Sequence, residues 1–250
     1  MLRWIGGLLL TSLLIGCGSW REKADEKRHA AEVYVSKGVG YMEEKRYEQA
    51  MEDLTRALEL NSNSSEAHNA MAVLYERLDK PAEAVTHYRR AVSLDENNYA
   101  ALNNYSRFLC SHGQSDEGLA FLDRVIDSKL YDQPWLVLTN KGICYKMTDR
   151  LEDAEHSFRA ALESQPLFAP ALLEMALISF DHQQYMSTRA FLQRYAGIVP
   201  HTAQTLWLSV QTETALGNAG LARTYADQLR GRFPNSPEAT AAREAGLLGR

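Results

Sequence analysis

The chain has 250 residues, 45% of them hydrophobic and 24% charged, a balance typical of a folded globular protein and not of a disordered or membrane-embedded one. Its formal net charge is −5 and the sequence has no basic stripe, which argues against a nucleic-acid partner because binding to phosphates needs a clustered basic surface. Three cysteines, Cys17, Cys110 and Cys144, are too few and too widely spaced for a disulfide framework or a zinc site.

The first predicted element, residues 1–16, is a targeting leader. Its apolar run from Trp4 to Gly16 is shorter than the roughly 20 residues that a bilayer-spanning helix needs. The run ends in Leu14-Ile15-Gly16-Cys17, which resembles a bacterial lipobox. This resemblance implies cleavage before Cys17 and attachment of acyl chains to that residue. An ordinary secretory leader that happens to precede a cysteine is the alternative.

Residues 17–30 are predicted to be the lipidated cysteine and a charged tether. Two or three acyl chains on Cys17 would anchor the protein stably, since each buried CH₂ contributes about 0.8 kcal/mol. Gly18 stands where an aspartate would resemble a signal for retention in the inner membrane. We therefore expect a lipid-anchored protein of the outer membrane that faces the periplasm. The charges from Arg21 to Arg28 are typical of a solvated spacer.

Residues 31–236 repeat small and bulky side chains with a period of 34 residues. In the first unit Gly38, Tyr41, Ala50, Leu54 and Ala57 carry the pattern, and their spacing resembles the tetratricopeptide repeat. The register breaks only at an inserted dipeptide, Gln133-Pro134. The predicted repeats are 31–64, 65–98, 99–132, 135–168, 169–202 and 203–236. One such match would be weak, whereas six in phase are specific.

Each repeat is predicted to form two antiparallel helices, each with a buried apolar stripe. Small residues such as Gly38 and Gly142 allow the two helices to approach closely, and prolines such as Pro166 end the second helix. A single pair cannot bury its own stripe, so neighbouring pairs must stack. Residues 237–250 are predicted to form a closing helix. The predicted fold is therefore all-α: a tetratricopeptide-repeat superhelical solenoid of six helix-turn-helix repeats plus a C-terminal capping helix.

The sequence carries no motif for catalysis, a cofactor or a metal. None of the seven histidines forms a His-Glu-x-x-His pair or lies near a cysteine at metal-ligand spacing, and no Gly-x-Ser-x-Gly motif occurs. We therefore expect a binding protein and not an enzyme, with no cofactor and no small-molecule substrate. Cys110 and Cys144 fall on the first helices of adjacent repeats, at different offsets, so a disulfide and two reduced thiols both remain open.

In tetratricopeptide-repeat proteins, fixed positions of the first helix of each repeat line an inner groove. The resemblance implies a groove for an amphipathic or extended peptide, with apolar ends and a polar middle zone whose asparagine amides offer both a donor and an acceptor. The alternative is that the apolar residues only pack against neighbouring helices. The predicted groove residues are Val35, Val39 and Met42, then Asn69, Asn103 and Arg107, then Leu173, Phe180 and Trp207, with Glu66 and Asn104 beside the middle set.

The lipobox, the tether and the repeats together resemble the PilW/PilF family of type IV pilus lipoproteins, and the stretch from Ala169 to Tyr195 adds to the likeness. The resemblance implies a pilotin, an outer-membrane lipoprotein that binds a peptide segment of the type IV pilus secretin subunit and promotes its localisation and multimer assembly. Two other kinds of lipoprotein adaptor remain open, one for outer-membrane barrel assembly and one for peptidoglycan hydrolases.

Overall fold

The computed structural model describes the backbone of residues 11–246 and the side chains of residues 21–246. Most of the predicted leader, the side chain of Cys17 and residues 247–250 lie outside these limits. Every regular element within the described range is an α-helix, and none is a strand. The helices confirm the prediction of an all-α tetratricopeptide-repeat fold with six helix-turn-helix repeats and a C-terminal capping helix.

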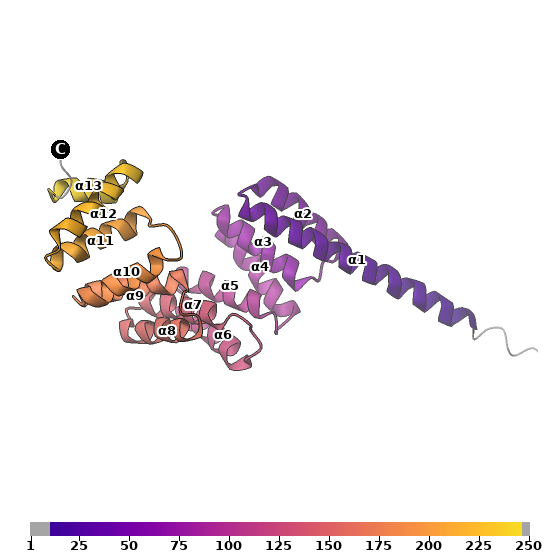
Figure 1. Cartoon of the computed structure of the whole chain (residues 1–250). Coiled ribbons are helices and arrows are strands. Elements are labelled where there is room, and N and C mark those ends of the chain that lie inside the picture. The colour runs from indigo at the N-terminus through magenta and orange to yellow at the C-terminus, as the bar shows by residue number, and fades with distance from the viewer. Residues whose placement is uncertain (1–10, 247–250) are drawn as a thin grey trace, which may run out of the picture. The chain divides into compact units, whose positions relative to one another are not determined.

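The helices follow one another as pairs joined by short turns (Figure 1). The pairs are α1 (Thr11–Glu43) and α2 (Tyr47–Leu60), α3 (Ser65–Arg77) and α4 (Pro81–Leu94), α5 (Tyr99–Ser111) and α6 (Ser115–Ser128), α7 (Pro134–Met147) and α8 (Leu151–Ser164), α9 (Ala169–Asp181) and α10 (Tyr185–Ala196), and α11 (Ala203–Ala215) and α12 (Ala219–Arg232). The last helix, α13 (Pro237–Glu244), packs against α11 and α12 and covers the final pair.

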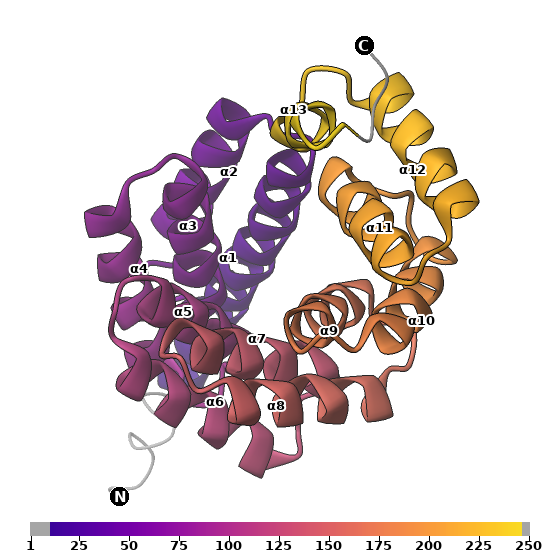
Figure 2. The ribbon, with the colours of Figure 1, turned by 90° about the vertical axis from the view of Figure 1, so that its left-hand side faces the viewer.

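The chain divides into two compact units after Phe108, inside α5. In the N-terminal unit, α3 packs against its partner α4 and also against α1 and α2. In the C-terminal unit, α8 packs against α9 and α10 packs against α11, so each of these pairs contacts the next (Figure 2). Each pair therefore buries against a neighbouring pair the apolar stripe that it cannot bury alone.

Helix α1 runs without a break through the segment predicted as a tether. This segment is rich in Ala, Glu, Lys and Arg, which have high helix propensity. Its charges also pair one turn apart, as Arg28 does with Asp25. The described side chains remain largely exposed until Ala31, which is fully buried where the first repeat begins. Local propensity, and not tertiary packing, therefore accounts for the helical form of this segment.

A residue in the left-handed conformation joins the two helices of each pair. The next residue donates its N–H to the carbonyl five positions back, as Arg46 does to Tyr41 and Gln184 does to Ser179, both at 2.8 Å. This turn ends the first helix and reverses the chain. The left-handed residues are Lys45, Asp79, Gly113, Asp149, Gln183 and Gly217, with φ between 56° and 78°.

Glycine is required where the two helices of a pair cross closely. A Cβ atom added to Gly38 would lie 2.7 Å from Cγ of Leu54, and one added to Gly142 would lie 2.6 Å from Cε1 of Phe158. Carbon atoms in favourable contact are about 3.5–4.0 Å apart, so neither position has room for a side chain. Both partners are fully buried on the second helix of the same pair. The close approach predicted from these glycines is therefore present.

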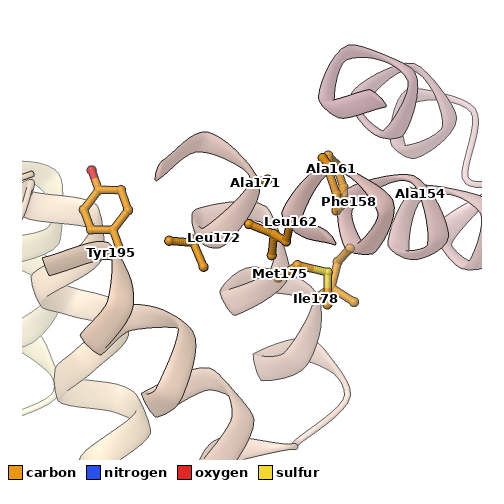
Figure 3. Packing of buried hydrophobic residues seen from close by; sticks show 9 residues of the cluster. All are labelled: Ala154, Phe158, Ala161, Leu162, Ala171, Leu172, Met175, Ile178 and Tyr195. Atoms are coloured by element: carbon orange, nitrogen blue, oxygen red, sulfur yellow. The ribbon is translucent and has the colours of Figure 1, made fainter. Parts of the chain in front are cut away.

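A buried apolar cluster joins α8, α9 and α10 in the C-terminal unit (Figure 3). Phe158 and Leu162 come from α8, Met175 and Ile178 from α9, and Tyr195 from α10. Full burial of one large apolar side chain contributes about 1.5–3 kcal/mol. The cluster therefore stabilises the junction between two repeats as well as each pair of helices.

Cys110 and Cys144 form a disulfide, with their Cα atoms 5.3 Å apart. The bond joins the last turn of α5 to α7 within the C-terminal unit. The sequence left this pairing open because the two offsets within the repeat differ. The difference arises from the inserted dipeptide Gln133-Pro134, and the two cysteines remain one period of 34 residues apart. They therefore lie at neighbouring places on successive first helices.

Candidate functional site

The N-terminal unit contains a groove of about 320 Å³ between the first helices of three successive repeats. Helices α1 and α3 supply most of its lining, and the start of α5 supplies the rest. One end is apolar, and the remainder combines amides with charged groups. The lining residues are Val35, Val39, Met42, Glu43, Glu66, Asn69, Ala70, Val73, Arg77, Asn98, Ala100 and Asn104.

The apolar end of the groove comes from α1. Val35, Val39 and Met42 lie four and three residues apart, so the helical period places them on one face. Val39 is 37% exposed, whereas Met42 is only 4% exposed and belongs to the core formed with α2 and α3. Val35 and Val39 are therefore the apolar side chains most available to a ligand, whereas Met42 is mainly part of the core.

An amide pair spans α3 and α5 beside this apolar end. The Nδ2 group of Asn104 donates a hydrogen bond to Oδ1 of Asn69 at 3.1 Å, and both side chains line the groove. Each asparagine amide has both a donor and an acceptor, so this bond leaves the Nδ2 group of Asn69 and Oδ1 of Asn104 for a further partner. A donor and an acceptor side by side match the C=O and N–H groups of a peptide backbone.

Asn103, which was predicted for the groove, lies elsewhere. Its side chain is only 2% exposed and does not line the groove, and the neighbouring Asn104 occupies the predicted place. Successive side chains of an α-helix point about 100° apart. A repeat alignment shifted by one residue therefore assigns to the groove a side chain that lies in the interior.

Hydrogen bonds to residues of the same unit hold the charged side chains of the groove in place. Arg77 donates from Nη1 to the backbone carbonyl of Met42 at 3.3 Å, and the hydroxyl of Ser64 donates to Oε2 of Glu66 at 3.0 Å. Glu43 and Glu66 lie in the same lining as Arg77. The groove therefore presents both signs of charge and suits a polar peptide flanked by an apolar side chain.

Arg107, another predicted groove residue, forms an ion pair within the N-terminal unit. Its Nη2 group donates to Oε2 of Glu76 at 2.8 Å, and the same carboxylate accepts a hydrogen bond from the hydroxyl of the buried Tyr88. Burial, and then the charge of Glu76, raises the pKa of Tyr88 far above its ordinary value. The phenol therefore stays protonated as the donor to Glu76.

The predicted apolar residues of the C-terminal unit are partly buried against its core. Leu173 packs on the cluster of α8 to α10, and Phe180 packs on a cluster that includes Leu192 and Leu208. Trp207 packs on the cluster of α11 to α13. A packing role accounts for these contacts, and a role in ligand binding stays a prediction.

Six residues of the groove lining were absent from the prediction: Ala70, Asn98 and Ala100, and also Glu43, Val73 and Arg77. The last three are the informative ones. They lie on α1 and α3, the helices that also carry Val39 and Asn69. Extending the same repeat positions to these two helices would have found all three. The sequence therefore contained the signal for all three, although the charge of Glu43 and Arg77 is more typical of helix positions that face solvent.

Neither a cluster of three or more potential metal ligands nor a membrane span occurs in the described part of the chain. Between residues 21 and 246, where the side chains are described, no three or more His, Cys, Asp or Glu side chains gather where they could hold a metal ion. Nor does this part of the chain contain a helix that is both long enough and apolar enough to cross a bilayer.

Comparison with known proteins identifies relatives along most of the chain. Models of the tetratricopeptide repeat match residues 31–64 and 65–98. The type IV pilus assembly protein PilF of Pseudomonas aeruginosa is 28% identical over 217 residues, which cover 86% of this chain and 86% of that protein.

Two solved structures resemble this fold and are also related in sequence. A structure of P. aeruginosa PilF has a TM-score of 0.78 at 26% identity and covers 88% of this chain and 99% of its own. A crystal structure of PilW, described as a widely conserved type IV pilus biogenesis factor, has a TM-score of 0.77 at 28% identity and covers 85% and 97%. The chain is therefore homologous to type IV pilus assembly proteins that have this fold.

Proposed function

We propose that this protein is an outer-membrane lipoprotein scaffold of type IV pilus biogenesis. It binds a peptide segment of the pilus secretin subunit and promotes the localisation and multimer assembly of that subunit. The observation that carries the proposal is the groove along α1, α3 and α5, which lies in a chain homologous to pilus assembly proteins. The groove has an apolar end and a backbone-binding amide pair, the two features that peptide recognition needs.

An extended peptide fits the groups on the groove wall. Val35 and Val39 contact an apolar side chain, while Asn69 and Asn104 donate to and accept from one residue of the peptide backbone. A hydrogen bond of this kind contributes about 1 kcal/mol net. The amides therefore fix the direction and register of the peptide, and the apolar contact selects its sequence.

Anchoring on a membrane supplements this modest affinity. Acyl chains on Cys17 confine the protein to the inner leaflet of the outer membrane, so bound secretin subunits concentrate in two dimensions and meet more often. The disulfide between Cys110 and Cys144 supports a periplasmic location, because such bonds persist in oxidising compartments. The protein acts by gathering subunits and not by covalent chemistry.

The groove is tested by charge substitutions in α1. A protein with Val35→Asp and Val39→Asp should bind a purified secretin periplasmic region at least roughly tenfold more weakly, because the apolar contact is lost. Val33→Asp is the matched control, since Val33 is also exposed on α1 but does not line the groove. Unchanged binding by the double variant, with helicity intact by circular dichroism, would contradict the proposal.

The anchor is tested in cells. A Cys17→Ser protein should still bind secretin in vitro but leave it outside the outer membrane, and heat-stable secretin multimers should decrease. Normal multimers in the outer membrane of such a strain would refute the role of the anchor. Capture of unfolded barrel proteins or of peptidoglycan hydrolases instead of secretin would assign the protein to one of the two other adaptor classes.

A further inference from the structure

A second hollow of about 680 Å³ lies on the N-terminal unit, along α3, α4 and the turn before α3. It shares no lining residue with the groove. Two histidines from different helices, His68 of α3 and His87 of α4, lie in its wall. The complete lining is Ser62, His68, Thr86, His87, Arg89, Arg90 and Ser93.

The two imidazoles point a nitrogen at each other. Nδ1 of His68 and Nδ1 of His87 are 3.0 Å apart, and the ring centroids are 5.0 Å apart. The other nitrogen of His68, Nε2, lies 3.2 Å from the backbone carbonyl of Ser62. A carbonyl accepts only, so Nε2 of His68 carries the proton and Nδ1 holds a lone pair. Without a metal, Nδ1–H of His87 donates to that lone pair.

We propose that His68 and His87 together bind a divalent transition-metal ion that prefers right-angled coordination, Cu²⁺ above all. Metal–imidazole bonds are about 2.0–2.1 Å long, so two nitrogens at a right angle are about 2.9 Å apart, and at a tetrahedral angle about 3.4 Å. The observed 3.0 Å is close to the right-angled value. Square-planar or tetragonal nitrogen sites suit Cu²⁺ and Ni²⁺, and Cu²⁺ forms the stronger complexes.

The surroundings of the pair resemble those of a metal-binding histidine. A metal-bound imidazole usually donates its second N–H to a carbonyl or carboxylate, which fixes the ring, and His68 has this bond to Ser62. His87 packs beside the ring of Tyr75, with centroids 5.4 Å apart. On binding, His87 moves its proton from Nδ1 to Nε2, so its tautomer changes but its charge does not. Each ring turns about χ2, which is a soft torsion, until both lone pairs lie about 45° from the line between the two Nδ1 atoms and meet at one ion.

The nearby arginines limit the affinity but do not block the site. The guanidinium of Arg90 donates to Oδ1 of Asn63 at 2.8 Å, and that of Arg89 donates from Nε to the hydroxyl of Tyr105 at 3.2 Å. Burial lowers the pKa of both histidines, which keeps the imidazoles in the neutral form that coordinates metals. No third His, Cys, Asp or Glu in the described chain completes the set, so water fills the other positions.

The test is a titration of the untagged full chain with CuCl₂, followed by electron paramagnetic resonance. All proteins carry Cys17→Ser because a free thiol would bind and reduce Cu²⁺, whereas Cys110 and Cys144 are already joined. We expect one specifically bound ion per chain with two equatorial nitrogen ligands. ZnCl₂, which favours tetrahedral coordination, should bind more weakly.

The variants separate the pair from ordinary surface histidines. His68→Ala and His87→Ala should each weaken Cu²⁺ binding roughly 100-fold. The remaining imidazole then binds the ion alone, without the higher affinity of two ligands held side by side. His156→Ala is the matched control, since His156 is exposed on α8, and it should change nothing. If an alanine variant does not fold, His87→Gln keeps a hydrogen-bonding group beside His68 and should show the same loss. Unchanged affinity in a folded variant of either histidine, or a spectrum without two nitrogen ligands, overturns the proposal.

Discussion

The carboxylate of Glu213 on α11 accepts two hydrogen bonds from the guanidinium of Arg189 on α10, from Nε at 2.7 Å and from Nη2 at 2.5 Å. Glu213 is only 3% exposed and also accepts a bond from Nδ2 of Asn218 at 3.1 Å. The pair joins the fifth and sixth repeats through a carboxylate that is shielded from water. Its geometry is bidentate, which adds directional specificity to the charge attraction.

Glu213→Ala should lower the free energy of unfolding by about 2–3 kcal/mol, because it removes three hydrogen bonds to a buried carboxylate and leaves a cavity. The matched control is Asp227→Ala, which breaks an exposed pair with Arg230 and should cost less than about 1 kcal/mol. Urea denaturation followed by circular dichroism measures both. Equal losses in the two variants would show that burial does not strengthen the Glu213 pair.

Two glycines on α1 should respond in opposite directions to the same substitution. Gly38→Ala should destabilise the protein by about 1–3 kcal/mol, because the added Cβ would meet Leu54. Gly40→Ala should stabilise it by up to about 1 kcal/mol, because a Cβ there meets nothing within 4 Å and alanine favours a helix. Thermal melts of the two variants give the sign directly. Stabilisation by Gly38→Ala would exclude the close crossing of α1 and α2.

The left-handed turns predict a stabilising substitution. Gln183 has a φ of 59°, a conformation that costs an ordinary residue roughly 1–2 kcal/mol relative to glycine. Gln183→Gly should therefore raise the free energy of unfolding by about 1 kcal/mol. Gln193→Gly, at an exposed position inside α10, should lower it by a similar amount. The prediction fails if the two glycine variants shift the urea midpoint in the same direction.

Stability should fall in mild acid through His201. Burial, and then the positive charge of Arg232, lowers the pKa of His201 in the folded protein. The imidazole of the unfolded chain takes up its proton near about pH 6.5, so below that value the unfolded state binds more protons and the folded state loses stability. Above it both states are neutral and the effect disappears.

The measurement compares the urea midpoints of the parent protein and His201→Gln at about pH 7.5 and about pH 5.5. These two pH values lie on either side of the ordinary pKa of histidine. The midpoint should drop less in the variant, which has no imidazole to protonate at that position. His182→Gln is a suitable control because His182 is exposed at the end of α9. An identical drop in the parent and His201→Gln proteins would rule out this contribution.

The sequence was sufficient to predict the helical pairs, because their period depends on side-chain sizes that the structure uses directly. Gly38 against Leu54 and Gly142 against Phe158 are contacts that no larger residue allows, so they recur at fixed spacing. The apolar end of the groove was predictable for the same reason, since Val35, Val39 and Met42 follow the helical period on α1.

The remaining differences concern single positions and side-chain partners, which a repeat pattern does not specify. Asn103 and Asn104 point about 100° apart on the same helix, so a shift of one residue in the repeat alignment changes which of them is assigned to the groove. Whether Cys110 and Cys144 come close enough to form the disulfide depends on where the insertion at Gln133 lies, and it falls in the connection between α6 and α7. The His68–His87 contact joins two helices through residues that have no counterpart in the repeat pattern.

The continuous course of α1 from Thr11 into the first repeat changes what an anchor on Cys17 would do. A flexible segment would leave the distance between the anchor and the groove variable. A helix rises about 1.5 Å per residue, so the 18 steps from Cys17 to Val35 (35 − 17) span about 27 Å. If acyl chains on Cys17 anchor the protein, as we propose, a rigid helix and not a flexible chain separates Val35 and Val39 from the lipid. The length of this helix would then limit how far from the bilayer the groove can lie, and so which part of a membrane-bound partner can reach it.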